Sequence, residues 1–295
     1  MSYQSSLAAN SFNNKTVLVT GGGSGIGRCI AHELASLGAK VLLLGRSIDK
    51  LQTVKDEIIS DGGQADYGSV DIRDEAGVVE VIQGFVENHG PIHGLVNNAG
   101  GQFPAELKDI SANGFLAVVR NNLVGGFIVA REVFKQSMQE HGGSVVNITA
   151  DYFGGMPLMG HSGAARAGME NLSQTQAIEW ANSGVRVNSV APGYIASSGM
   201  DSYEDPDMIA RIPKFGQAVP TGRMGTESEI SSAVCFLLSD GAAYINGATI
   251  PVDGGSSLCL SSPLYEIKVA DKNNQAFEGF HRGETPQILK DNATK

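Results

Sequence analysis

The stretch Thr20-Gly-Gly-Gly-Ser-Gly-Ile-Gly27 decides the fold. It comes directly after the apolar run 16–20 and directly before a segment of helical period, 26–38. Its glycines let the chain turn tightly, bring backbone N–H groups close to a diphosphate and pack a helix against a sheet. The helix N-terminus adds a positive partial charge. The stretch therefore predicts a dinucleotide-binding strand–turn–helix unit. The predicted contacts in this turn are Gly21, Ser24, Gly25, Ile26 and Gly27.

Along the chain before and after this turn, short apolar runs alternate with longer segments of helical period. Strands are expected at 16–20, 40–45, 93–97, 144–148 and 185–190, and a last one near 247–253. Helices are expected near 26–38, 48–61, 74–88, 112–140, 162–183 and 227–239. This alternation implies βαβ units in a parallel sheet, and the continuous hydrophobicity of the strands implies that helices cover both faces. The predicted fold class is a single-domain, doubly wound α/β fold.

Two regions depart from the alternation. Residues 194–224 interrupt it, and a loop this long in a compact domain is more often functional than inert, so we expect a substrate loop or lid rather than a surface excursion. Residues 257–295 are polar and weakly periodic, which predicts a C-terminal extension that is either a tail or an arm packed on a neighbouring subunit. The domain itself is expected over 14–256, after an N-terminal tail over 1–13.

Composition excludes several classes of function. The net charge of -10 weighs against nucleic acids and anionic membranes as partners. The three cysteines, Cys29, Cys235 and Cys259, have no zinc-site spacing, so we expect free thiols and no metal. No apolar stretch is expected to approach the 18 or so residues that span a bilayer. The first residues lack a secretory pattern and the last lack a peroxisomal one, so a soluble, cytoplasmic protein is expected.

The end of the second strand indicates which dinucleotide binds. NAD sites carry an Asp or Glu about 20 residues after the glycine turn, where it accepts hydrogen bonds from the ribose 2′-OH. Here the strand ends at Gly45-Arg46-Ser47. A guanidinium attracts a 2′-phosphate, Ser47 adds a donor, and a carboxylate would repel that phosphate. Arg46 and Ser47 therefore favour NADP(H), the alternative being a solvated arginine at a strand end.

Further motifs follow at regular places after the strands. They are Asp71, Asn97-Asn98-Ala99-Gly100, Asn122, Pro192-Gly193 and Val252-Asp-Gly-Gly255. Together with the glycine turn, these motifs resemble those of the short-chain dehydrogenase/reductase family over residues 14–256. The resemblance implies a Rossmann fold with a mostly parallel, seven-stranded central sheet. It also implies a homotetramer built on the helices 112–140 and 162–183.

The same resemblance implies a set of cofactor contacts. Asp71 would hold the adenine amino group, with Ile72 beside it, and Ile195 would meet the nicotinamide carboxamide after Pro192-Gly193. The cleft would be lined by Asn98, Ala99 and Gly100.

The catalytic pattern of the family is broken in this chain. Most members carry Tyr-x-x-x-Lys on the helix after the fifth strand, where the Lys binds the nicotinamide ribose and lowers the pKa of the Tyr. The corresponding stretch runs from His161 to Asn171 and places Ser162 at the Tyr position and Arg166 at the Lys position. Arg166 can hold ribose hydroxyls and supply positive charge, but its guanidinium cannot pass on a proton.

Three stretches resemble the 2-enoyl-CoA and 2,4-dienoyl-CoA reductase branch of the family. They are 98–104, 161–168 and 179–181. Dienoyl-CoA reductases carry the catalytic Tyr at the end of the fifth strand, about fifteen residues before the Lys. Tyr152 stands fourteen residues before Arg166, at the end of Asn147-Ile-Thr-Ala-Asp-Tyr152. Tyr152 is therefore the candidate proton donor, the alternative being a tyrosine that only lines the cleft.

Three more residues are candidates for catalysis. Asn122 would anchor a water or donate to the substrate oxygen, or else bond to a helix carbonyl. Thr149 would add a hydroxyl donor, unless Ala150 occupies the family's serine position instead. His161 would replace the missing tyrosine as an acid, or serve as a cap or packing residue at the helix start.

The sequence leaves three functions open. The first is an NADPH-dependent reductase of an α,β-unsaturated acyl-CoA thioester, because reduction at the β-carbon needs only a stabilised enolate and one proton. The second is a carbonyl or 3-oxoacyl reductase, or an alcohol dehydrogenase, with an atypical site. The third is an inactive dinucleotide-binding subunit that has lost the Tyr/Lys pair.

Overall fold

The central sheet of the protein is parallel and seven-stranded. A computed structural model describes residues 2–259, 268–270 and 275–291. In it the strands follow the order β3-β2-β1-β4-β5-β6-β9, and every neighbouring pair is parallel. The strands are β1 (Thr16–Thr20), β2 (Lys40–Gly45), β3 (Gln64–Ser69), β4 (Gly94–Asn97), β5 (Gly143–Ile148), β6 (Val185–Pro192) and β9 (Thr249–Val252). The predicted doubly wound Rossmann fold is confirmed.

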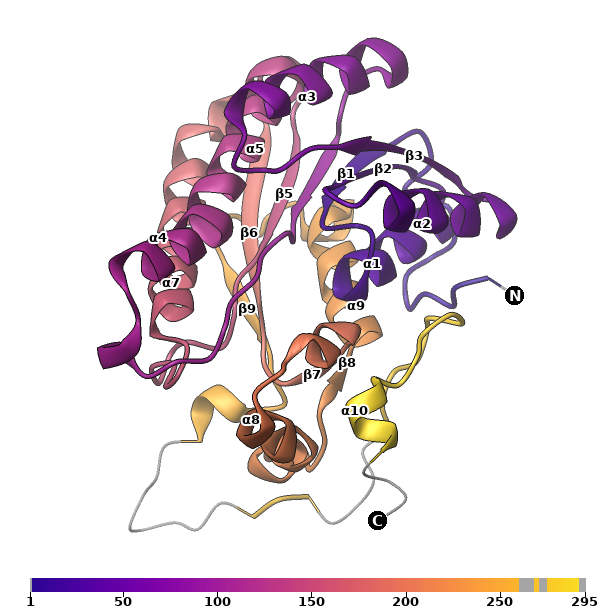
Figure 1. The fold of residues 1–295 in the computed structure, drawn as a ribbon. Helices are drawn as coiled ribbons and strands as arrows, with labels where there is room; N and C mark the ends of the chain where they lie inside the picture. The colour runs from indigo at the N-terminus through magenta and orange to yellow at the C-terminus, as the bar shows by residue number, and fades with distance from the viewer. Residues whose placement is uncertain (1, 260–267, 271–274, 292–295) are drawn as a thin grey trace.

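Helices cover both faces of the sheet, as Figure 1 shows. On one face lie α1 (Gly25–Ser36), α2 (Ile48–Ser60) and α9 (Glu227–Leu238). On the other lie α3 (Glu75–His89), α4 (Ala112–Val119), α5 (Gly125–Val133) and α7 (Gly160–Glu179). Side chains alternate along β1, so Val17 and Val19 pack into the first layer and Leu18 into the second. A hydrophobic core is therefore packed on each face of the sheet.

The helical run from Ala112 to His141 is not a regular α-helix. π-helical turns over Arg120–Val124 and Phe134–Met138 divide it into α4, α5 and α6 (Gln139–His141). The run is long and apolar enough to cross a membrane by length and composition, so the expectation that no stretch approaches that limit was wrong. Within the domain, Val129 and Val133 are fully buried in the core under this run. A helix packed on a sheet satisfies the same length and composition test.

The substrate loop and the end of the chain lie beside the carboxyl end of the sheet. The loop contains the short parallel pair β7 (Ile195–Ala196) and β8 (Gly225–Thr226), with α8 (Pro206–Arg211) between them. The described part of the C-terminal extension ends in α10 (Gln287–Lys290), which contacts this loop. Figure 1 shows α8 and α10 at the same end of the molecule as β7 and β8.

Candidate active site

The glycine turn has the geometry of a diphosphate cradle. Gly21 has φ +66°, which favours glycine, and a Cβ on Gly27 would stand 2.5 Å from Asn98 Nδ2. α1 begins at Gly25, and the side chain of the N-cap Ser24 makes no capping hydrogen bond. The first N–H groups of this helix are therefore not occupied by a cap, as an anion site at a helix N-terminus requires.

Asn98 and Thr20 join the end of β4 to the glycine turn. Thr20 Oγ1 accepts the N–H groups of Asn98 and Ala99, each at 2.9 Å, and Asn98 Nδ2 donates to Thr20 O at 3.0 Å. β1 and β4 are neighbours at the place where the strand order reverses, which is where α/β sheets bind ligands. The structure thus brings the glycine turn and the predicted cleft residues Asn98–Gly100 together.

The residues predicted to select the cofactor follow β2, and those predicted to lie at its adenine follow β3. Arg46 and Ser47 are exposed directly after β2, and Ser69 Oγ donates to Arg46 O at 3.2 Å. Arg73 binds both carboxylate oxygens of Asp71, at 2.9 and 2.6 Å, and lowers the pKa of that carboxyl to about 2. Asp71 is therefore ionised at neutral pH. Ile72 is buried against Gly125.

Asn122 is the centre of a buried polar chain. It lies in the first π-helical turn and is 2% exposed. Its Oδ1 accepts the N–H of Gly101 at 2.9 Å, and its Nδ2 donates to Ser162 Oγ at 3.4 Å. Ser162 Oγ donates in turn to Gln102 Oε1. Ser162, which stands at the family's Tyr position, thus belongs to an amide–hydroxyl–amide chain. The sequence did not single out Gln102 as part of this chain.

Arg166 lies against the same loop as Asn122. Its Nη1 donates to Ile148 O at 2.6 Å at the end of β5. A Cβ on Gly100 would collide with Arg166 Nη2 and stand 3.0 Å from Asn122 Oδ1, so both side chains reach Gly100. Burial lowers the pKa of the Arg166 guanidinium to about 10, which leaves it charged at neutral pH. Its Nε is buried without a hydrogen-bond partner among the described residues, a donor that fits a ribose hydroxyl.

Tyr152 lies just beyond the carboxyl end of β5. The preceding Asp151 donates its N–H to Pro192 O at 2.9 Å, which ties this segment to the end of β6. The Tyr152 ring stacks on Phe153, with ring centroids 4.8 Å apart. Thr149 is buried and donates its hydroxyl to Val190 O at 3.1 Å, so that hydroxyl already has an acceptor on β6.

His161 is fully buried at the start of α7. Its Nδ1 accepts the N–H of Ser162 at 2.9 Å, which places the ring proton on Nε2 when the imidazole is neutral. Nε2 is buried without a hydrogen-bond partner in the described part of the chain. The ring packs edge-on against Phe103, with centroids 4.5 Å apart. These contacts favour the packing interpretation of His161 over a role as an acid.

The segment after β6 packs against Asp253, which follows β9, and pairs with β8. A Cβ on Gly193 would stand 2.7 Å from Asp253 Cα, while Ile195 is buried in the core and pairs with Gly225. A Cβ on Gly25 would lie 3.6 Å from Ser198 Oγ and 3.7 Å from Glu227 Oε1. Burial raises the pKa of Glu227 to about 7. Ser198 and Glu227 could not be predicted from the sequence, because they reach the glycine turn only through long-range packing.

The fold and the cleft together define a dinucleotide-binding α/β oxidoreductase. A family model described as "Enoyl-(Acyl carrier protein) reductase" matches residues 21–257. The chain belongs to the short-chain dehydrogenase/reductase family, whose Rossmann fold binds NAD(P), and it is an oxidoreductase.

Known relatives differ in the substrates that their names give. A "Probable 2,4-dienoyl-CoA reductase" of Bacillus subtilis is 36% identical over 83% of this chain and 97% of its own length. A levodione reductase of Leifsonia aquatica is 36% identical over 83% of this chain and 95% of its own. The structure of a citronellol catabolism dehydrogenase of Pseudomonas aeruginosa is 52% identical, with a TM-score of 0.78, over 86% of this chain and all of its own. The family is therefore established, and the substrate is not.

Proposed function

We propose that the protein is an NADPH-dependent reductase that delivers hydride to the β-carbon of an α,β-unsaturated acyl-CoA thioester. The observation that carries the proposal is the pair of replacements on α7, with Ser162 at the Tyr position and Arg166, a half-buried residue with a buried Nε, at the Lys position. A carbonyl reductase of this family relies on a proton relay through the Lys, and a guanidinium does not release its proton. The 36% identity to a protein named as a 2,4-dienoyl-CoA reductase supports the same substrate class.

The cofactor would be held by groups at and beyond the carboxyl ends of the strands. The glycine turn and the N-terminus of α1 would bind the diphosphate, Asp71 and Ile72 would lie at the adenine, and Arg166 would bind the nicotinamide ribose. Asn98–Gly100, Pro192-Gly193 and Ile195 would line the rest of the site. When bound, the reduced nicotinamide supplies the hydride.

The remaining chemistry falls on side chains of the protein. Reduction at the β-carbon leaves an enolate, whose oxygen needs hydrogen-bond donors or positive charge. Arg166 supplies a permanent charge, and the Asn122 amide, held by Gly101 and Ser162, is a fixed donor for a water or the thioester oxygen. Tyr152, beyond β5, would deliver the proton. Thr149 and His161 would shape the site, since Thr149 is bonded to β6 and His161 to the α7 backbone.

Arg46 and Ser47 carry the proposed preference for NADPH. Both are exposed at the end of β2, where a 2′-phosphate would meet them. We expect Arg46→Ala to raise the KM for NADPH about 10- to 100-fold, because a charge-assisted hydrogen bond to phosphate is worth about 1.5–3 kcal/mol. The KM for NADH is expected to stay within about twofold, since NADH lacks that phosphate. Steady-state kinetics with both cofactors checks this, and an equal effect on the two would exclude Arg46 from phosphate recognition.

The proposal includes a homotetramer built on the 112–141 and 160–179 helices. Apolar side chains on these helices are exposed in the single chain, namely Leu116, Val124, Phe127 and Ile178. Ile178, at 79% exposed, is the most exposed of the four. Burial of these side chains between subunits would explain their exposure.

A second candidate function is favoured by the 52% identity to the citronellol catabolism dehydrogenase. On that alternative the substrate is an isoprenoid alcohol or the carbonyl compound formed from it, and the product is its oxidised or reduced partner. The exposed rings of Phe103, which packs on His161, and Phe153, which stacks on Tyr152, would suit either a branched alcohol or an acyl chain.

A panel of substrates separates these possibilities. NADPH absorbance would be followed with 2-enoyl-CoA, 2,4-dienoyl-CoA, 3-oxoacyl-CoA and simple ketones, and NADP⁺ reduction with citronellol. Oxidation of NADPH by the unsaturated thioesters alone is expected. Turnover with only ketones or citronellol would favour the second candidate. Binding of NADPH without any turnover would favour the inactive subunit.

A further inference from the structure

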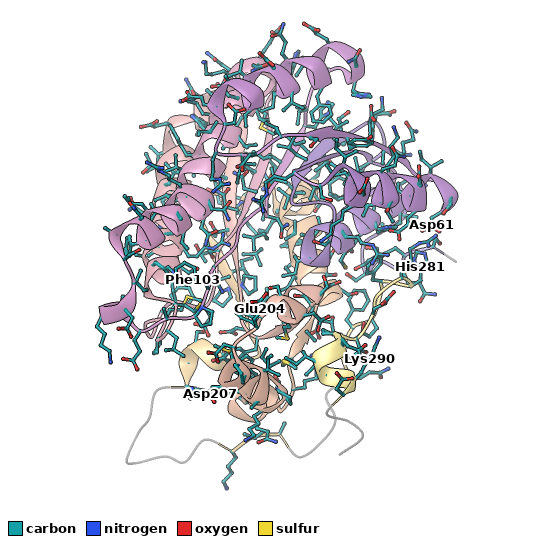
Figure 2. All side chains as sticks on the ribbon, viewed as in Figure 1. Asp61, Phe103, Glu204, Asp207, His281 and Lys290 are labelled. Carbon is teal, nitrogen blue, oxygen red and sulfur yellow. The ribbon has the colours of Figure 1, made fainter. Side chains whose placement is uncertain are left out.

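The last described segment of the chain, 275–291, is anchored at three places on its own domain; we call it the strap. The first anchor is at the end of α2. Arg282 binds both carboxylate oxygens of Asp61, at 2.8 and 3.0 Å, and His281 Nε2 lies 3.0 Å from the same carboxylate. Figure 2 shows Asp61 and His281 next to each other. Phe280 is buried between the rings of Tyr3 and His32, with the Arg28 guanidinium over its own ring.

The second anchor joins the strap to the start of α9. Thr226 Oγ1 donates to Phe277 O at 2.8 Å, and Phe280 donates its N–H to Ser228 Oγ at 3.2 Å. Thr226 is the last residue of β8, the strand that pairs with β7 of the substrate loop. The strap is thus fixed next to the base of that loop.

The third anchor lies on the substrate loop itself. The Asp201 carboxylate accepts the backbone N–H groups of Gln287 and Ile288, each at 3.1 Å, at the start of α10. Asp201 belongs to the 3₁₀ turn Ser198–Ser202, whose Met200 is buried. The other end of this turn, Ser198, lies against Gly25 of the glycine turn. One short turn therefore touches the cofactor cradle at one end and the strap at the other.

We infer that the strap holds the substrate loop against the cofactor cradle through Asp201, which makes Asp201 a positioning residue for substrate binding. The two hydrogen bonds to Asp201 are charge-assisted, so they restrain the loop more than neutral ones would. The first two anchors fix the strap to α2 and α9, and both helices pack their apolar side chains into the hydrophobic core on one face of the sheet. The inference rests on the proposed function only for its kinetic probe, an unsaturated acyl thioester.

The test compares Asp201→Ala with Asp207→Asn in the full-length protein. Asp207 is an exposed carboxylate in α8 of the same loop and serves as the matched control; Figure 2 labels it. Asp201→Asn keeps one acceptor oxygen and is expected to fall between Asp201→Ala and the wild type. Hydrogen–deuterium exchange of 197–212 reports on the loop, and steady-state kinetics with 2-enoyl-CoA and NADPH report on binding.

We expect Asp201→Ala to accelerate exchange over 197–212 about fivefold or more and to raise the KM for 2-enoyl-CoA about 5- to 20-fold, with kcat within about twofold. Asp207→Asn should match the wild type. Exchange in Asp201→Ala equal to that of Asp207→Asn would overturn the inference, and so would a loss confined to kcat. If the wild type reduces no acyl thioester, the proposed function fails, while the exchange data still decide the role of the strap.

Discussion

Replacing Tyr152 with phenylalanine is expected to lower kcat for thioester reduction about 100- to 10,000-fold, the usual contribution of a positioned proton donor. The reason is the position of Tyr152 just beyond the end of β5, in a segment that the Asp151 N–H ties to Pro192 O at the end of β6. Phenylalanine preserves the stack on Phe153, so the fold and the cleft should persist. The affinity for NADPH, measured by fluorescence titration, should change by no more than about twofold because the ring is not expected to bind the cofactor.

Tyr194→Phe is the matched control for this variant. Tyr194 is also near the carboxyl end of the sheet, but its ring packs on Phe215 of the substrate loop, with centroids 4.4 Å apart. Its kcat should remain near that of the wild type. A Tyr152→Phe enzyme with wild-type kcat would show that this tyrosine only lines the cleft, and the proton would then have to come from water or from His161.

Arg166→Ala is expected to weaken NADPH binding about 10- to 100-fold and to lower kcat about 100-fold. The variant removes the only charge on the Lys position, together with the buried Nε donor and the bond to Ile148 O. Isothermal calorimetry with NADPH measures the first effect and NADPH oxidation the second. A thermal melt establishes that the variant is folded, since a half-buried side chain has been removed.

Arg166→Lys gives the sharper comparison. An amine at this position restores the family's usual charge and ribose donor, so NADPH affinity should recover to within about tenfold of the wild type. Wild-type affinity and turnover in Arg166→Ala would remove this residue from the mechanism.

The fold could be predicted from the sequence because its strands are buried on both faces. Runs such as Val17–Val19 and Val41–Leu44 carry no polar residue and stand between glycine-marked turns. No range was predicted for β3, and the reason is physical: it is one of the two edge strands, and its Gln64-Ala-Asp-Tyr-Gly-Ser69 sequence is only partly buried or exposed. The π-helical turn at Asn122 also escaped prediction, since hydrophobic periodicity does not distinguish one extra residue per turn.

The parts of the candidate site that follow from the course of the backbone could be predicted from the sequence. The directions in which its side chains point could not. The glycine turn and Asn98 follow from the order of strands and turns. Sequence position alone did not indicate that the Thr149 hydroxyl faces β6 or that Ser162 joins Asn122 and Gln102. The strap could not be foreseen either, because its polar sequence has no periodicity and its anchors lie more than fifty residues away along the chain.

The most direct test of the proposed reaction is the position of the transferred hydrogen. The enzyme would be incubated with 2-enoyl-CoA and NADPH that carries deuterium at the transferred position, and the product would be analysed by NMR. The proposed reaction yields a saturated acyl thioester with one deuterium on the β-carbon and a solvent proton on the α-carbon. An unchanged thioester, together with deuterium on the carbinol carbon of an alcohol formed from an added ketone or aldehyde, would contradict it.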